Sequence, residues 1–238
     1  MGTKWRIVFV SQQRLVKFLT QPILVRIILT GKRLSEQTMN FDISDLGNQA
    51  KYRLLNGGVT PRPIAWISTR SKVGVDNLAP YSFFTVASCN PPVLMYTQIT
   101  PRTDIHKDTL KNLMETGECV VNIVSSDLMD MMNATSASLP IDESEFSHVG
   151  VEYSASQTVL PLSVEESPVR YECRLRETFS IGDSAGSGTV VLLDVVSIYV
   201  RDDLYSDGII DQARIDSVGK MGGDGYYIAA EYNELGRP

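Results

Sequence analysis

Apolar and polar residues alternate along much of residues 39–238, and this period of two is typical of β-strands. Several runs combine the alternation with β-branched and aromatic residues, and turn residues separate them. The runs are PIAWIST, YSFFTVAS, VLMYTQI, ECVVNIVS, SPVRYECRLRETFSIG and GTVVLLDVVSIYVRDD. The last two flank the glycine- and serine-rich DSAGSG and predict a hairpin. Because no strand–helix–strand rhythm is present, we expect a mainly β fold, an antiparallel barrel with short accessory helices.

The period changes at residues 108–116, where Leu110, Leu113 and Met114 follow helical spacing. We expect these three residues to share the buried face of a short helix. Asp108 is expected to cap the helix by accepting hydrogen bonds from its first turn, and Gly117 to end it.

Three further segments have less regular patterns. SDLMDMMNAT predicts a short helix with Ser126 as its cap. Residues 139–162 are acidic and rich in turn residues, so we expect an excursion over the surface. The tail DSVGKMGGDGYYIA is expected to be a glycine-rich loop that carries two tyrosines.

The chain has 238 residues and a net charge of −6, which argues against nucleic acid as its main partner. No apolar run is long enough to span a bilayer, so no membrane span is expected. The three cysteines are widely spaced, which suits free thiols in a reducing compartment and favours a cytoplasmic location, and Cys89 is expected to be buried. No CxxC pair is present and the histidines are His106 and His148, so a metal site is not expected, and a Ser-His-Asp triad would have to recruit one of the two.

Residues 1–38 form a basic N-terminal extension that differs from the rest of the chain. They hold seven of the 22 basic residues and one of the 28 acidic residues, which leaves 15 and 27, a net charge of −12, for the domain at residues 39–238. Three interpretations stay open: a mitochondrial transit peptide, upstream sequence ahead of a natural start at Met39, or a helix that packs on the domain. The first would place the protein in mitochondria.

Candidate ligand chemistry begins with the segment HKDTLKNL. A helix N-terminus exposes unpaired N–H groups that attract phosphate, and here Lys107 adds a full charge and Thr109 a hydroxyl donor. His106 would add charge when protonated. An ordinary capped surface helix is the alternative interpretation of the same residues.

The runs TPRPIAWIST and NLAPYSFF combine a rigid backbone, small side chains and neutral polar groups. A flat ring could lie against such a backbone while the polar groups bind its edge. Arg62 would bind a phosphate or form an ion pair with a surface acid. Stiffness and low bulk come from Pro61, Pro63, Pro80, Ala65 and Ala79. The neutral donors and acceptors are Ser68, Thr69, Asn77 and Ser82. The aromatic residues Trp66, Tyr81, Phe83 and Phe84 are of types that are more often core than ligand contacts.

In their sequences and in their order along the chain, these motifs resemble the flavin reductase-like, FMN-binding split-barrel family, which includes flavoredoxin. The matching segments are PRPIAWIST, NLAPYSFF, PPVLM, KDTLKNL, TGECVVNIVS, EFSHVGVEYS, SPVRYECRL and GKMGGDGYY. The resemblance implies a homodimer of six-stranded split β-barrels with Greek-key topology and FMN at the subunit interface. Where the family often has Arg before Gly-Gly, this chain has Lys220 and Met221.

The resemblance also implies roles for particular residues. The backbone of Pro63, Ile64 and Ala65 would face the isoalloxazine ring, and the family's phosphate end matches Lys107, Asp108 and Thr109. The ring edge, the ribityl chain and part of the phosphate would be held by Ser68, Thr69, Asn77, Ala79, Pro80, Tyr81 and Ser82, with Arg62 as a further candidate.

Since the residues offer no convincing acid/base pair, no catalytic side chain is assigned and the flavin would carry the chemistry. Three functions remain open. The first is NAD(P)H-dependent reduction of flavin or a small electron acceptor through bound FMN. The second is a flavoredoxin-like carrier that takes electrons from a donor protein, and the third is non-catalytic FMN binding. Because no strand–GxGxxG–helix unit exists, NAD(P)H would bind in the flavin cleft itself.

Overall fold

The computed structural model describes residues 39–100, 107–228 and 233–236. The chain divides into two compact units, Met1–Asp45 and Leu46–Pro238. In the first unit, the described part holds the short 3-10 helix η1 (Ile43–Asp45). Residues 1–38 and His106 lie outside the described residues, so the interpretations given for them stay predictions.

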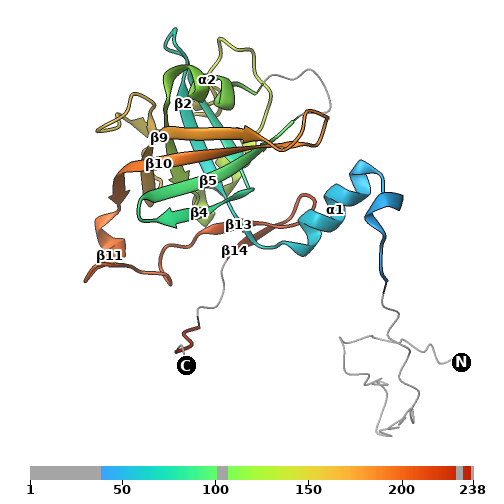
Figure 1. Ribbon diagram of the computed structural model, residues 1–238. Coiled ribbons are helices and arrows are strands. Elements are labelled where there is room, and N and C mark those ends of the chain that lie inside the picture. The colour runs from blue at the N-terminus through green and yellow to red at the C-terminus, as the bar shows by residue number, and fades with distance from the viewer. Residues whose placement is uncertain (1–38, 101–106, 229–232, 237–238) are drawn as a thin grey trace, which may run out of the picture. The chain divides into compact units, whose positions relative to one another are not determined.

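The second unit is built on one sheet with the strand order β3-β2-β6-β9-β10-β5-β4 (Figure 1). All neighbouring strands in this sheet run antiparallel. The strands are β2 (Ala65–Arg70), β3 (Asp76–Tyr81), β4 (Phe84–Cys89), β5 (Pro92–Ile99), β6 (Glu118–Ile123), β9 (Val169–Ser180) and β10 (Gly188–Val200). The prediction of a mainly β, antiparallel fold is confirmed, and β9 and β10 form the predicted hairpin.

The expected number of six strands is wrong, because the sheet has seven. After a turn at residues 71–75 the chain forms β3, and Ser82 and Phe83 then interrupt the run that was expected to be one strand. Pro80 has no backbone N–H and is disfavoured inside a sheet. It is tolerated because β3 lies at the edge of the sheet, where no further strand needs the missing N–H.

Smaller sheets complete the second unit. The tail forms a hairpin that pairs with the start of the barrel, so the prediction of a loop alone is wrong. These strands are β1 (Arg62–Pro63), β13 (Val218–Lys220) and β14 (Tyr226–Ile228). Two further pairs are β7 (Tyr153–Ser154) with β8 (Ser163–Val164), and β11 (Tyr205–Ser206) with β12 (Ile209–Ile210).

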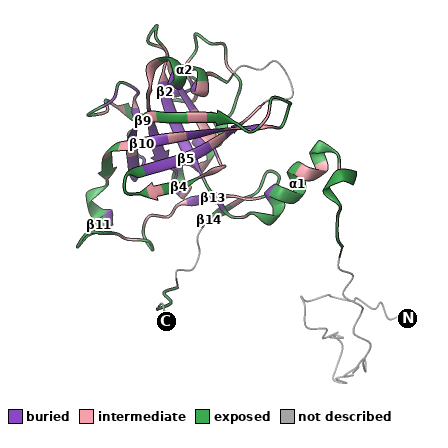
Figure 2. Cartoon of the chain, in the orientation of Figure 1, coloured by how far each residue is buried: buried purple, intermediate pink, exposed green. Residues whose placement is uncertain are grey.

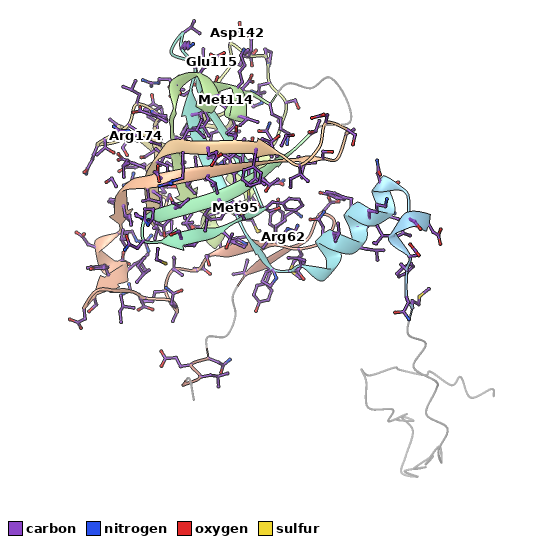
Figure 3. All side chains as sticks on the ribbon, viewed as in Figure 1. Arg62, Met95, Met114, Glu115, Asp142 and Arg174 are labelled. Atoms are coloured by element: carbon purple, nitrogen blue, oxygen red, sulfur yellow. The ribbon has the colours of Figure 1, made fainter. Side chains whose placement is uncertain are left out.

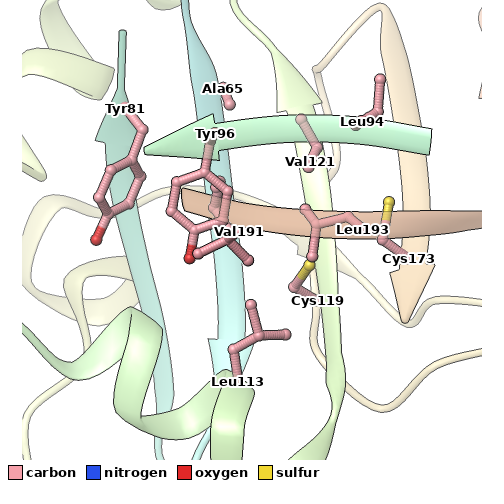
Figure 4. Packing of buried hydrophobic residues seen from close by; sticks show 11 residues of the cluster. Ala65, Tyr81, Leu94, Tyr96, Leu113, Cys119, Val121, Cys173, Val191 and Leu193 are labelled. Atoms are coloured by element: carbon pink, nitrogen blue, oxygen red, sulfur yellow. The ribbon is translucent and has the colours of Figure 1, made fainter. Parts of the chain in front are cut away.

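Both faces of β2 are buried, which explains why its apolar residues Ala65, Trp66 and Ile67 are consecutive and do not alternate with polar ones (Figure 2). Ala65 and Ile67 face the barrel interior. Figure 4 shows the side chains they join there, which include Tyr81, Tyr96, Leu113, Cys119, Cys173 and Val191. Trp66 faces the opposite way, into a second cluster with residues of the helices and loops outside the barrel. The expectation that Trp66 and Tyr81 belong to the core is confirmed.

Short helices lie between the strands. They are α1 (Asn48–Gly58), α2 (Asp108–Thr116), η2 (Ser126–Leu128), α3 (Met129–Ala134), α4 (Glu145–Val149) and η3 (Asp202–Leu204). None of the described helices is long and apolar enough to cross a bilayer. Ser126 begins η2, but its hydroxyl bonds to Asp216 instead of capping the helix, so its predicted role is wrong.

The C-terminal end of α2 was predicted correctly, with Gly117 left-handed at φ 77° after the last turn. Its buried face was not. Leu113 is buried as expected, but Met114 is 62% exposed, and Thr109 and Asn112 are buried in its place. The helix is rotated because these two polar residues have hydrogen-bonding partners on β2 and β3.

Two other expectations are corrected. The segment at residues 139–162 does not simply cross the surface, because Phe146 and Val151 are buried in the second cluster. Cys89 is exposed, since it lies at the end of the edge strand β4, whereas Cys119 and Cys173 are buried in the barrel as expected.

Candidate functional site

Three hollows follow β3, and Pro80 lines all of them. The α2 pocket, of about 120 Å³, lies where α2 begins. The middle pocket, of about 370 Å³, is lined by Pro80, α3 and the tail hairpin. The α1 hollow, of about 1100 Å³, is lined by α1, β5 and the loop at residues 184–187. We call the α2 pocket and the middle pocket together the β3 groove.

The first turn of α2 forms one end of this groove. Lys107 occupies the N-cap position, and no side chain caps the helix. Its ammonium lies 5.6 Å from the centre of the Tyr81 ring, and the protein atoms around it displace water and lower its pKa. Uncapped N–H groups and an adjacent cation attract an anion for the same electrostatic reason.

Asp108 lies beside Lys107 but does not act as the predicted cap, because it is already the first residue of the helix. Its Oδ1 atom is buried and has no hydrogen-bonding partner among the described residues. A buried carboxylate oxygen without a donor is costly, so this atom requires a donor that the described chain does not supply. Asp108 also lines the α2 pocket.

Thr109 does not offer its hydroxyl to the pocket. The side chain is 1% exposed, and Oγ1 donates to Oδ1 of Asn77 at 2.7 Å. Thr69 donates to the same Asn77 oxygen at 3.3 Å and accepts from Asn112 at 3.3 Å. This buried network joins α2 to β2 and β3, and it fixes where the first turn of α2 lies.

Glu145 completes the network from α4. Its carboxylate accepts the backbone N–H of Leu78 at 2.9 Å and both carboxylate oxygens lie 3.1 Å from Nδ2 of Asn77. Burial raises the pKa of Glu145, while the bonds from Leu78 and Asn77 oppose that rise. Sequence reasoning missed Glu145, because no local pattern links it to a strand more than sixty residues earlier.

The middle pocket combines segments that are distant in the sequence. Tyr226 of the tail hairpin donates to Oδ1 of Asn133 on α3 at 2.8 Å. The ammonium of Lys220 lies 4.5 Å from the centre of the Tyr226 ring and donates to the carbonyls of Gly223 and Gly225. Burial, followed by the nearby charge of Arg62, lowers the pKa of Lys220. Asn133, Ser136 and Lys220 were not predicted as site residues.

Arg62, which is labelled in Figure 3, is buried, and, contrary to one interpretation, it forms no ion pair with a described acid. Its guanidinium donates to the carbonyls of Asn56 at 2.7 Å, Val59 at 2.9 Å and Met221 at 3.1 Å. It therefore joins the end of α1 to the tail. A role in phosphate binding stays a prediction, and these carbonyls already occupy both terminal nitrogens.

The other predicted site residues fall into two groups. Pro63 is exposed, whereas Ala65, Ser68 and Thr69 are fully buried, and Ser68 donates to the carbonyl of Leu162. The structure does not bring these four to the hollows. The residues that line the hollows are Ile64, Asn77, Ala79, Pro80, Tyr81, Ser82, Lys107, Asp108 and Thr109.

Comparison with known families decides what kind of domain surrounds this groove. Residues 57–218 match the model of the flavin reductase like domain. The chain belongs to this family. An uncharacterized protein of Halalkalibacterium halodurans is 36% identical over 202 residues, which cover 84% of this chain and 97% of the relative. An uncharacterized protein of Deinococcus radiodurans is 35% identical, with coverage of 83% and 89%.

Solved structures of other members identify the architecture. Nitrilotriacetate monooxygenase component B from Bacillus cereus has a TM-score of 0.79 and 29% identity, covering 84% of this chain and all of its own. A putative flavin reductase with split barrel domain from Shewanella frigidimarina has a TM-score of 0.73 and 25% identity, with the same coverage. The flavin reductase-like domain of this chain is therefore a split barrel, as its motifs predicted.

Proposed function

We propose that this flavin reductase-like protein binds FMN in the β3 groove and passes electrons from NAD(P)H through it to flavin or another small acceptor. One observation carries the proposal: the α2 pocket combines an anion site with a buried acceptor that lacks a donor. Lys107 and the uncapped start of α2 suit a phosphate, and Oδ1 of Asp108 suits a hydroxyl. FMN carries both groups on one ribityl phosphate chain.

The middle pocket supports the same ligand. Its volume of about 370 Å³ lies within the usual range for small-molecule sites, roughly 300–1,000 Å³, and it adjoins the α2 pocket at Pro80 and Ser136. Ile64 and Pro80 supply apolar contact, and Ser82 and Asn133 supply neutral polar groups. A flat ring with one polar edge matches this lining.

When bound, FMN would supply the hydride and electron chemistry, which no side chain of the groove provides. The side chains contribute position and charge. Lys107 and α2 would hold the phosphate, Asp108 the ribityl chain and Pro80 one ring face. The ammonium of Lys220 would lie beside the ring, where a positive charge favours the more negative, reduced state.

The test is an absorbance spectrum of the purified full chain, followed by anaerobic titration with NADH and with NADPH. We expect a flavin spectrum that bleaches with at least one nucleotide and recovers in air. If neither nucleotide reduces the bound flavin but a reduced ferredoxin does, the protein is an electron carrier and not an NAD(P)H-dependent reductase. Bound flavin that no donor reduces would leave FMN binding without catalysis, and no bound flavin would refute the proposal.

A homodimer is part of the proposal. Within the described chain, residues 195–200 of β10 pair with β9 but have no partner on their other edge. Val196 and Ile198 in this segment are 41% and 56% exposed, so the free edge is apolar. Such an edge is usually covered by another chain. Light scattering should give a mass about twice the 26.4 kDa of one chain.

A further inference from the structure

The α1 hollow is larger than one mononucleotide requires. Its volume is about 1100 Å³, against about 370 Å³ for the middle pocket, which it adjoins at Pro80 and Ser82. It also shares Lys107 with the α2 pocket. A second ligand could therefore lie directly beside one that fills the β3 groove.

The charge of the hollow has one sign. Among the described residues its lining includes Lys51, Arg53 and Lys107 and no carboxylate, although residues 39–238 carry a net charge of −12. Neither Lys51 nor Arg53 forms an ion pair with another described residue. Cations gathered at a concave surface without acids raise the local concentration of anions.

The walls have fixed positions and suit a nucleotide. Arg62 holds the end of α1 through the carbonyls of Asn56 and Val59. On the opposite side, Gly186 donates to the carbonyl of Thr100 at 3.0 Å, which holds the loop at residues 184–187 against β5. Tyr52, Tyr81 and Phe83 supply aromatic surface, and Ser184 and Ser187 supply hydroxyls. Aromatic, cationic and hydroxyl groups together match a base, a phosphate and a sugar.

We propose that the α1 hollow binds the adenosine phosphate half of the hydride donor, and that Lys51 and Arg53 make the protein prefer NADPH to NADH. This inference rests on the proposed function, in which Lys107 holds the FMN phosphate. Lys51 and Arg53 then remain for the donor. NADPH carries one phosphate more than NADH, and two unpaired cations bind that additional negative charge and so raise the affinity for NADPH.

The experiment uses the FMN-loaded full chain and a matched pair of probes, adenosine 2′,5′-bisphosphate and AMP, with affinities measured by calorimetry. The wild type should bind the bisphosphate about tenfold more tightly, since each of two partly exposed charge pairs contributes about three- to fivefold. In the double variant Lys51→Gln/Arg53→Gln the preference should fall below about threefold. The control Lys72→Gln lies on the exposed 71–75 turn outside all three hollows and should leave the preference unchanged.

Equal affinities for the two probes in the wild type, or an undiminished preference in the double variant, would overturn the inference. So would failure of both probes to bind, as expected if a second copy of the chain fills the hollow. Steady-state KM values for NADPH and NADH separate this inference from the proposed function. If both nucleotides reduce the flavin equally well, the inference alone fails. If neither does, the proposed function fails, while the probes still report on the hollow.

Discussion

Replacing Lys107 with alanine removes the ammonium at the end of the β3 groove and leaves the first turn of α2 intact. The residue is the N-cap, and its side chain makes no capping bond, so the helix does not depend on it. Its ring contact with Tyr81, at 5.6 Å, is long for a strong cation–π pair. The substitution should therefore affect ligand binding much more than folding.

The expected size of the effect follows from the exposure of the ammonium. A hydrogen bond to a charged group contributes roughly 1.5–3 kcal/mol, but Lys107 is exposed as a residue and the contact would be partly screened. A loss of about 1–2 kcal/mol, or about five- to thirtyfold in Kd, is reasonable. Lys111→Ala, on the exposed face of the same helix and outside the α2 pocket, should change Kd less than about twofold.

The assay is fluorescence titration of flavin-free protein with FMN and with riboflavin, which lacks the phosphate. Lys107→Ala should weaken FMN binding and leave riboflavin binding nearly unchanged, with a thermal midpoint close to that of the wild type. An equal loss for both flavins would show that Lys107 acts on the fold of the pocket. Unchanged FMN binding would remove Lys107 from the site.

Three further predictions concern the same helix and its supports. Asp108→Ala should weaken FMN and riboflavin binding by similar factors, since the buried Oδ1 atom would serve the ribityl chain common to both, and equal affinities for wild type and variant in the same titration would contradict this. Burial raises the pKa of Glu145 above its ordinary value of 4.5, so the folded chain binds this proton more tightly than the unfolded chain. The wild type should therefore lose stability relative to Glu145→Gln as the pH rises from 4.5 through the raised pKa of the folded state. Urea unfolding on both sides of this window checks the sign, and a difference independent of pH would contradict it. Leu113→Ala should lower the free energy of unfolding by about 2–5 kcal/mol and Met114→Ala by less than about 0.5, and the reverse order would restore the helical face expected from periodicity.

The features that local sequence predicted correctly depend on local chemistry. The start and end of α2 follow from Gly117 and from the change of apolar period, and the β9–β10 hairpin follows from two long alternating runs around a flexible turn. The order of motifs along the chain was enough to identify the split-barrel family. Lys107 and Asp108 were predicted as site residues because charged groups at the start of a helix can be recognised without knowledge of the fold.

The features that the sequence did not predict depend on contacts between distant segments. Thr109 and Asn112 are buried on α2 because Asn77 and Thr69 provide their partners, and apolar periodicity cannot detect a polar buried face. The middle pocket joins Ser82 to Asn133 and Tyr226, which only the folded chain brings together. Strand β3 was not predicted because DNLAPY lacks β-branched residues, and the edge position that tolerates Pro80 is a property of the whole sheet.

That edge position also explains why a groove lies along β3. In the register of β2 and β3, Leu78 is opposite Ser68 and Pro80 is opposite Trp66. The Leu78 N–H bonds to Glu145 and not to β2, so it points outward, and two residues later the nitrogen of Pro80 points the same way but carries no hydrogen. The outer edge therefore has no free N–H at either position, and another strand cannot extend the sheet there. Leu78 is fully buried, but Pro80 lines both pockets of the groove, so its outward carbonyl remains as an acceptor for a ligand N–H or O–H group.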